Sequence, residues 1–118
     1  MKSKGKISDG VKDREEIECK IEPPQKMEQI LRELGYSVTF RYQKYRTIYK
    51  IERVNVELFL DETPIGNYLE IEGEIESIHQ IAERLGFERN AYITESYISL
   101  YAKWCRQHGS HPSEMTFA

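Results

Sequence analysis

Three carboxylates between residues 58 and 73 have the spacing of a metal-binding or charge-lined sheet face. An apolar-rich run ends in Asp61, a turn containing proline and glycine follows, and a short strand then carries Glu70 and Glu72. Because side chains alternate faces along a strand, Glu70 and Glu72 point to the same side, and the turn brings Asp61 towards them. Carboxylates that converge in this way repel one another, and Mg²⁺ or Mn²⁺, which prefer oxygen ligands, would neutralise them. The solvated outer face of an antiparallel hairpin fits the same pattern, so the triad alone leaves both interpretations open.

Length and composition favour one small globular domain. Of the 118 residues, 31% are charged and 39% are hydrophobic, and the net charge of −3 disfavours general nucleic-acid binding. No apolar run approaches the roughly 20 residues that span a membrane, and the N-terminus shows no signal-peptide pattern. The two cysteines, Cys19 and Cys105, do not make a disulfide framework. We therefore expect a cytoplasmic protein with reduced thiols.

The strands that must position the carboxylates can be placed from residue alternation and β-branched or aromatic content. Residues 1–13 are polar and are expected to form an arm or the remnant of a strand. The residues 109–118 are expected to form a disordered tail, which leaves residues 14–108 as the domain. The predicted strands cover about residues 14–21, 36–51, 54–60 and 69–72.

Three helices with apolar residues on one side are predicted at residues 24–34, 74–85 and 95–107. Gly35 and Gly86 follow the first two helices, as is typical of helix C-termini, and Thr94 is predicted to cap the third. A carboxylate-bearing strand, a helix ending in Leu-Gly and an aromatic residue occur twice, which is a weak internal echo. Helices of this kind pack on the apolar side of a sheet, so the pattern predicts an α+β fold with about four antiparallel strands.

The opposite side of the predicted sheet is charged. On an open sheet this face would be solvated, whereas on a sheet that curls into a barrel it would line a polar channel. Lysine and arginine would then bind phosphate oxygens, and carboxylates would hold the metal ion that bridges those phosphates. The residues on this face are Arg14, Glu16, Glu18, Lys20, Lys44, Arg46, Glu57, Asp61, Glu70 and Glu72.

Several motifs together resemble the CYTH, or triphosphate tunnel metalloenzyme, superfamily, and most closely its class IV adenylyl cyclase-like branch. They are Arg-Glu-Glu-Ile-Glu at 14–18, Lys-Tyr-Arg at 44–46, Leu-Asp-Glu-Thr-Pro-Ile-Gly at 60–66, Leu-Glu-Ile-Glu-Gly at 69–73 and Ser-Tyr at 96–97. The resemblance implies an antiparallel tunnel of about eight strands with helices outside. It also implies a bound triphosphate and a divalent metal ion, Mg²⁺ or Mn²⁺.

Members of this superfamily cyclise ATP to cyclic AMP, hydrolyse thiamine triphosphate or cleave inorganic triphosphate. Carried over to this sequence, the resemblance assigns roles to nine charged side chains. Glu16, Glu18 and Asp61 would be catalytic acidic residues, Asp61, Glu70 and Glu72 would hold metal, and Lys4, Arg14, Lys44 and Arg46 would bind the substrate.

The order of the motifs resembles the C-terminal half of such a domain. The family opens with Glu-x-Glu-x-Lys, which residues 16–20 match, but the segments that follow correspond to the family's second half. A half-tunnel of about four strands cannot close, and its open edges invite pairing with another chain. We therefore expect a homodimer that completes the tunnel around ATP or another triphosphate. The expected activity is metal-dependent processing of a triphosphate, most like that of class IV adenylyl cyclases. A triphosphatase that acts on thiamine triphosphate or inorganic triphosphate, and a non-catalytic half-domain that binds nucleotide or polyphosphate, are the alternatives.

Overall fold

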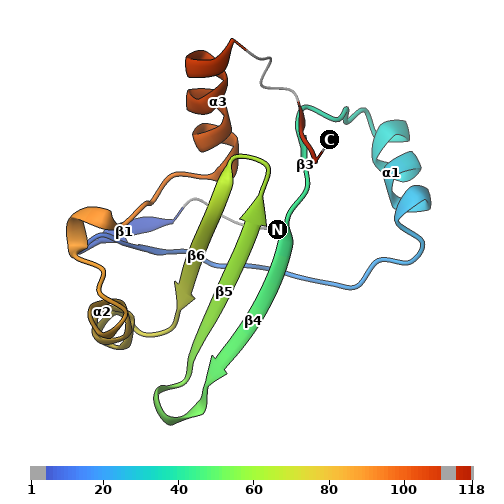
Figure 1. The fold of residues 1–118 in the computed structure, drawn as a ribbon. Helices are drawn as coiled ribbons and strands as arrows, with labels where there is room; N and C mark the ends of the chain where they lie inside the picture. Colours follow the sequence, from blue (N-terminus) through green and yellow to red (C-terminus); the bar gives the residue numbers. More distant parts are fainter. Residues whose placement is uncertain (1–4, 110–113, 118) are drawn as a thin grey trace.

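The structure, a computed structural model, describes residues 5–109 and 114–117 (Figure 1). It is an α+β fold, as predicted, with helices around an open antiparallel sheet. In chain order the elements are β1 (Lys6–Ser8), β2 (Val11–Asp13), α1 (Pro24–Glu33), β3 (Arg41–Tyr42), β4 (Tyr45–Ile51), β5 (Val56–Thr63), β6 (Gly66–Glu72), α2 (Ile75–Arg84), α3 (Tyr97–His108) and β7 (Glu114–Met115). Short 3-10 turns at Glu52–Val54 and Arg89–Ala91 complete the list.

The main sheet has three antiparallel strands in the order β4-β5-β6, one fewer than the approximate number predicted. The register sets Asp61 of β5 between Arg46 of β4 and Tyr68 of β6. Further along the same face of the sheet, Phe59 lies opposite Glu70, and Glu57 lies opposite Glu72. The predicted charged side of these strands is therefore present. β4 and β6 are the two edges of this sheet, so it does not close into a barrel.

The strand predicted at residues 14–21 does not form in the single chain, so this prediction is wrong. Within the stretch, Glu16 forms an isolated β-bridge, and the neighbouring residues have no strand assignment. A strand needs a neighbour that satisfies its backbone groups, and alternation of side chains cannot supply one. Residues 6–13, expected to belong to an arm or the remnant of a strand, form the β1–β2 hairpin around Asp9 and Gly10, both of which have positive φ.

The three predicted helices are confirmed, with small shifts at their ends. α1 and α2 each end at a leucine and a glycine with φ of 95° at Gly35 and 86° at Gly86, a conformation that costs glycine little. The predicted cap at Thr94 is wrong, because α3 begins later. Ser96 caps it, and its hydroxyl accepts a hydrogen bond from the backbone N–H of Ser99.

The long strand predicted at residues 36–51 is interrupted, and the end of the chain accounts for the break. β3 pairs in parallel with β7, and the backbone N–H of Gln43 donates to the carbonyl of Met115 at 2.8 Å. Met115 is fully buried in a cluster with Tyr101 and Cys105. The structure thus differs from the expected disordered tail at residues 114–117, because burial of Met115 offsets the entropy of ordering this segment.

One cluster of buried side chains lies between α3, β7 and the segment around Phe40. Ile78, Ile81 and Ala82 of α2 are also buried. α1 contains no buried residue and stands apart from the three-stranded sheet in Figure 1. Within residues 5–109 and 114–117, no helix is both long and apolar enough to cross a membrane.

Candidate functional site

A fully buried carboxylate on the central strand organises the charged face. Asp61 has no exposed surface, and Arg46 on the neighbouring strand donates two hydrogen bonds to its carboxylate. Arg46 Nε donates to Oδ1 at 2.6 Å, and Nη2 donates to Oδ2 at 2.7 Å. The pairing of β4 with β5 places the two residues directly opposite each other, which makes this two-pronged geometry accessible.

Two further side chains converge on Oδ2 of Asp61. Lys44 Nζ donates to this oxygen at 3.2 Å, and the hydroxyl of Tyr97, the first residue of α3, donates at 2.6 Å. The sequence motif at 96–97 had singled out Tyr97, but no role had been assigned to it. Its hydroxyl connects α3 to the middle of the sheet, so one carboxylate ties together β4, β5 and α3.

These contacts determine the protonation of the cluster. Burial opposes ionisation of Asp61, but hydrogen bonds from Arg46, Tyr97 and Lys44 outweigh it and lower the pKa of the carboxyl to about 2. The hydrogen bond to Asp61 raises the pKa of Arg46, and burial followed by the Asp61 contact raises the pKa of Tyr97. Asp61 is therefore ionised, and Arg46 and Tyr97 remain protonated at neutral pH.

Aromatic rings surround the two cations. Lys44 Nζ lies 5.1 Å from the ring centre of Tyr97 and 6.0 Å from that of Tyr42. Arg46 Cζ lies 4.6 Å from the ring centre of Phe59, and the ring of Tyr68 meets Tyr97 edge-on at 5.5 Å. These cation–π contacts and Asp61 hold both cations in place, while 22% of the Lys44 side chain and 28% of the Arg46 side chain remain exposed.

The carboxylates of β6 lie beside this cluster. Glu70 Oε2 pairs with Arg46 Nη2 at 3.2 Å, so Arg46 bridges Glu70 and Asp61. Burial raises the pKa of the Glu72 carboxyl, and the charges of Glu16 and Glu70 add to this effect. Glu72 is thus surrounded by like charge that Arg46 offsets only in part.

The fit of a divalent metal ion differs between these carboxylates. Asp61 already accepts four hydrogen bonds from cations and a hydroxyl, whereas Glu70 and Glu72 share one side of β6 and offer the oxygen ligands that Mg²⁺ and Mn²⁺ prefer. Among the residues that the structure describes, no group of three or more histidine, cysteine, aspartate and glutamate side chains is arranged to hold a metal ion. In the single chain, Glu70 and Glu72 therefore supply only some of the oxygen ligands that a metal ion needs. Metal binding by Asp61, Glu70 and Glu72 together stays a prediction.

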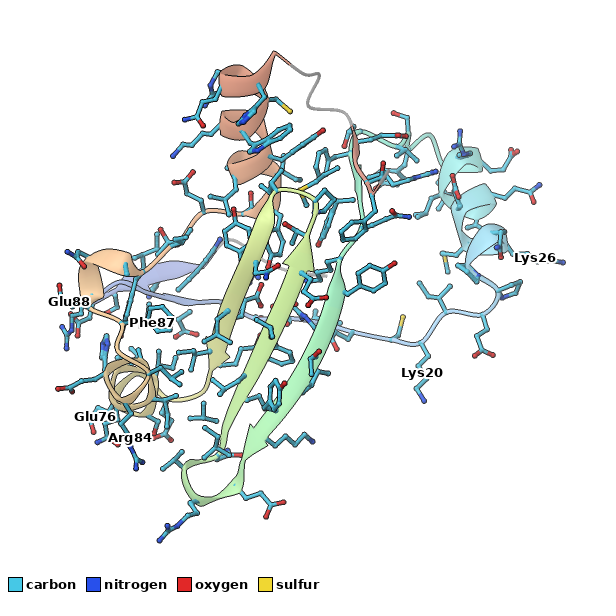
Figure 2. The ribbon with its side chains drawn as sticks, in the orientation of Figure 1. Lys20, Lys26, Glu76, Arg84, Phe87 and Glu88 are labelled. Carbon is cyan, nitrogen blue, oxygen red and sulfur yellow. The ribbon has the colours of Figure 1, made fainter. Side chains whose placement is uncertain are left out.

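The remaining predicted site residues are placed less centrally. Arg14 Nε pairs with Glu16 Oε1 at 3.3 Å, and Glu16 lies close enough to Glu72 to affect its pKa. Glu18 is exposed, and Lys4 lies outside the described residues. Figure 2 shows Lys20 beyond the β4 edge, on the connection to α1, so Lys20 does not join the cluster around Asp61.

Comparison with known proteins agrees with the sequence motifs. Residues 2–97 match the model of the CYTH domain family. The chain is also 35% identical over 106 residues to a Methanocaldococcus jannaschii protein named "Putative adenylate cyclase". This match covers 80% of the chain but only 59% of the relative, so the chain spans well under two thirds of that protein. No solved structure matches the chain.

Proposed function

The chain belongs to the CYTH domain family, and we propose that it acts in metal-dependent processing of a triphosphate. The activity it most resembles is that of class IV adenylyl cyclases, which convert ATP to cyclic AMP. The observation that carries this proposal is the pair of partly exposed cations, Lys44 and Arg46, held on one side of the sheet by the buried Asp61. A triphosphate presents several anionic oxygens, and such a pair matches them with charge-assisted hydrogen bonds.

In this proposal Asp61 has a positioning role towards the two cations. Its hydrogen bonds restrict the rotamers of Lys44 and Arg46 before any ligand arrives, which reduces the entropy lost on binding. The Lys44 ammonium can donate further hydrogen bonds, and the Arg46 guanidinium has N–H donors beyond the two that bond to Asp61. Both side chains would therefore bind phosphate oxygens without first giving up Asp61.

Glu70 and Glu72 would hold the divalent ion next to these phosphates. Their strand register places them on the same side of the sheet as Arg46. The raised pKa of Glu72 reflects its burial and, after that, the nearby negative charges of Glu16 and Glu70. When bound, the ion would neutralise charge on the phosphate oxygens. Glu16 and Glu18 would complete the acidic side, with Lys4 and Arg14 as further phosphate contacts.

The open sheet bears on how such a site would be completed. Two edges of a three-stranded sheet remain unpaired within the described strands, and a tunnel needs roughly eight strands to close. We propose a homodimer that brings two charged faces together about a two-fold axis. The alternative function, a half-domain that binds nucleotide or polyphosphate without turnover, is favoured by the openness of the same face.

Incubation of the purified chain with ATP or inorganic triphosphate, with Mg²⁺ or Mn²⁺, tests the proposal when the products are resolved by chromatography. Cyclic AMP supports the cyclase, and release of pyrophosphate or phosphate without cyclic product supports a triphosphatase. Binding without turnover, measured by titration calorimetry, supports the non-catalytic half-domain. Absence of both turnover and binding contradicts the triphosphate site itself.

A further inference from the structure

α1 and α2 are equivalent helices. Each has ten residues, and every residue of α1 has its counterpart 51 positions later in α2. The two helices also end alike. The backbone N–H of Tyr36 donates to the carbonyl of Leu31, and that of Phe87 donates to the carbonyl of Ala82. The helix part of the weak echo in the sequence therefore recurs in the structure.

The two helices differ in burial. Ile78, Ile81 and Ala82 of α2 are buried, and α2 contacts β6, the strand that precedes it. The counterparts of these residues on α1 form an apolar face that has no cover: Ile30 is 51% exposed and Leu31 is 43% exposed. Leu34 at the end of the helix is also exposed. An apolar face of this kind is typical of a helix that packs on a sheet. The residues of the α1 apolar face are Met27, Ile30, Leu31 and Leu34.

The three-stranded sheet has an edge that matches this helix. β6 has α2 beside it, whereas β4 pairs with β5 on one side and with no other described strand. Tyr49 of β4 is 52% exposed, and Tyr45 on the same side of the strand is exposed as well. Tyrosines of an edge strand provide a broad apolar surface with a polar rim, which suits contact with an amphipathic helix.

The chain's own α1 is held away from this edge. Its Glu28 pairs with Arg41 of β3 at 3.6 Å, and Phe40 beside Arg41 packs with the cluster of Tyr101, Cys105 and Met115. In Figure 1, α1 lies beside β3, while β4 runs from there towards the opposite end of the molecule. The apolar face of α1 is therefore presented outwards, within reach of another molecule.

We propose that α1 docks on the β4 side of the sheet of a second copy of this chain. The inference rests on the proposed dimer and specifies its contact. A two-fold arrangement uses the helix-on-sheet contact twice, which brings the buried area towards the roughly 1,600 Å² of a typical specific interface. It also covers both exposed surfaces at once.

Ile30→Glu tests the docking, with Gln25→Glu as the matched control on the opposite side of α1. Neither side chain is buried in the single chain, so both variants should keep the circular dichroism spectrum and melting temperature of the wild type. In light scattering from about 1 to 500 µM, wild type and Gln25→Glu should approach twice the monomer mass, and Ile30→Glu should associate at least about tenfold more weakly. Equal association of all three proteins, a monomeric wild type, or open-ended growth to large particles would overturn the proposal.

Disulfide trapping locates the contact. In a Cys19→Ser background, Ile30→Cys protein mixed with Tyr49→Cys protein should form a disulfide-linked heterodimer faster than Gln25→Cys mixed with the same partner. Equal rates for the two mixtures would contradict docking on β4. Triphosphate binding is measured on the same wild-type samples. Its absence contradicts the proposed function, whereas the mass and trapping results decide the docking.

Discussion

The hydroxyl of Tyr97 on α3 donates a hydrogen bond of 2.6 Å to Oδ2 of Asp61 on β5, which lies 36 positions earlier in the sequence. The same oxygen accepts from Lys44 and Arg46, so the position of α3 and the position of the two cations depend on one buried carboxylate. A charge-assisted hydrogen bond of this length is stronger than a bond between neutral groups. α3 thus contributes to the candidate site although its remaining residues lie outside it.

Replacement of Tyr97 by phenylalanine should remove this hydrogen bond and keep the ring packing. We expect the free energy of unfolding to fall by about 1.5–3 kcal/mol, because the bond joins a hydroxyl to a buried charge. Urea denaturation followed by circular dichroism measures the change. Tyr36→Phe, at an exposed position, is the control and should change stability by less than about 0.5 kcal/mol. Equal effects of the two substitutions would contradict the role given to the Asp61 contact.

The stability of the protein should depend on the ionisation of Asp61 at acid pH. Its pKa of about 2 in the folded chain lies below the ordinary value near 4, so the ionised form stabilises the fold above pH 4. This contribution, about 2 kcal/mol, is lost as the pH falls towards 2. The difference in unfolding free energy between wild type and Asp61→Asn should therefore shrink by about that amount between pH 5 and pH 2. A difference that stays constant over this range would contradict the assignment.

The parts of the fold that depend on local pattern were predictable from the sequence. The hairpin of β5 and β6 and all three helices follow from alternation, helical spacing and glycine positions. The segment at residues 14–21 has an equally good strand pattern but forms only an isolated β-bridge at Glu16, because strand formation depends on the tertiary structure as well as on the local pattern. β7 was missed for the opposite reason. Its two residues carry no pattern, and a single buried side chain, Met115, fixes them.

Only part of the cluster around Asp61 was predictable from the sequence. The alternation of side chains places Lys44, Arg46 and Asp61 on one side of the sheet, and the structure brings them together. The sequence could not show that Asp61 is enclosed by its own cations, because this depends on strand register and on burial by α3. Tyr97 carried a signal only as part of a short motif, and its partner is far along the chain.

Mg²⁺ or Mn²⁺ should raise the melting temperature of the wild type, because a ligand bound to the native state stabilises it by mass action. Glu72→Gln should abolish this rise. It should also stabilise the metal-free protein at pH 7, since the raised pKa of Glu72 means that its ionised form is disfavoured in the fold. Glu76→Gln on α2, labelled in Figure 2, is the control and should keep the wild-type response to metal. Equal metal-induced shifts in the two variants would exclude Glu72 as a ligand.

Lys44→Ala should weaken binding of inorganic triphosphate at least about tenfold, because it removes a preorganised charge-assisted contact. Lys50→Ala removes the same charge from the far end of β4, opposite Glu57, and should change the affinity less than about threefold. Titration calorimetry at two salt concentrations measures the triphosphate affinity of both variants. Higher salt should reduce the difference between the two affinities, since exposed charges are screened. Arg46→Ala should weaken triphosphate binding as Lys44→Ala does. It should also destabilise the fold, because the buried Asp61 loses both hydrogen bonds from the Arg46 guanidinium. Equal affinities of the Lys44 and Lys50 variants would show that net charge, rather than the cluster around Asp61, attracts the ligand.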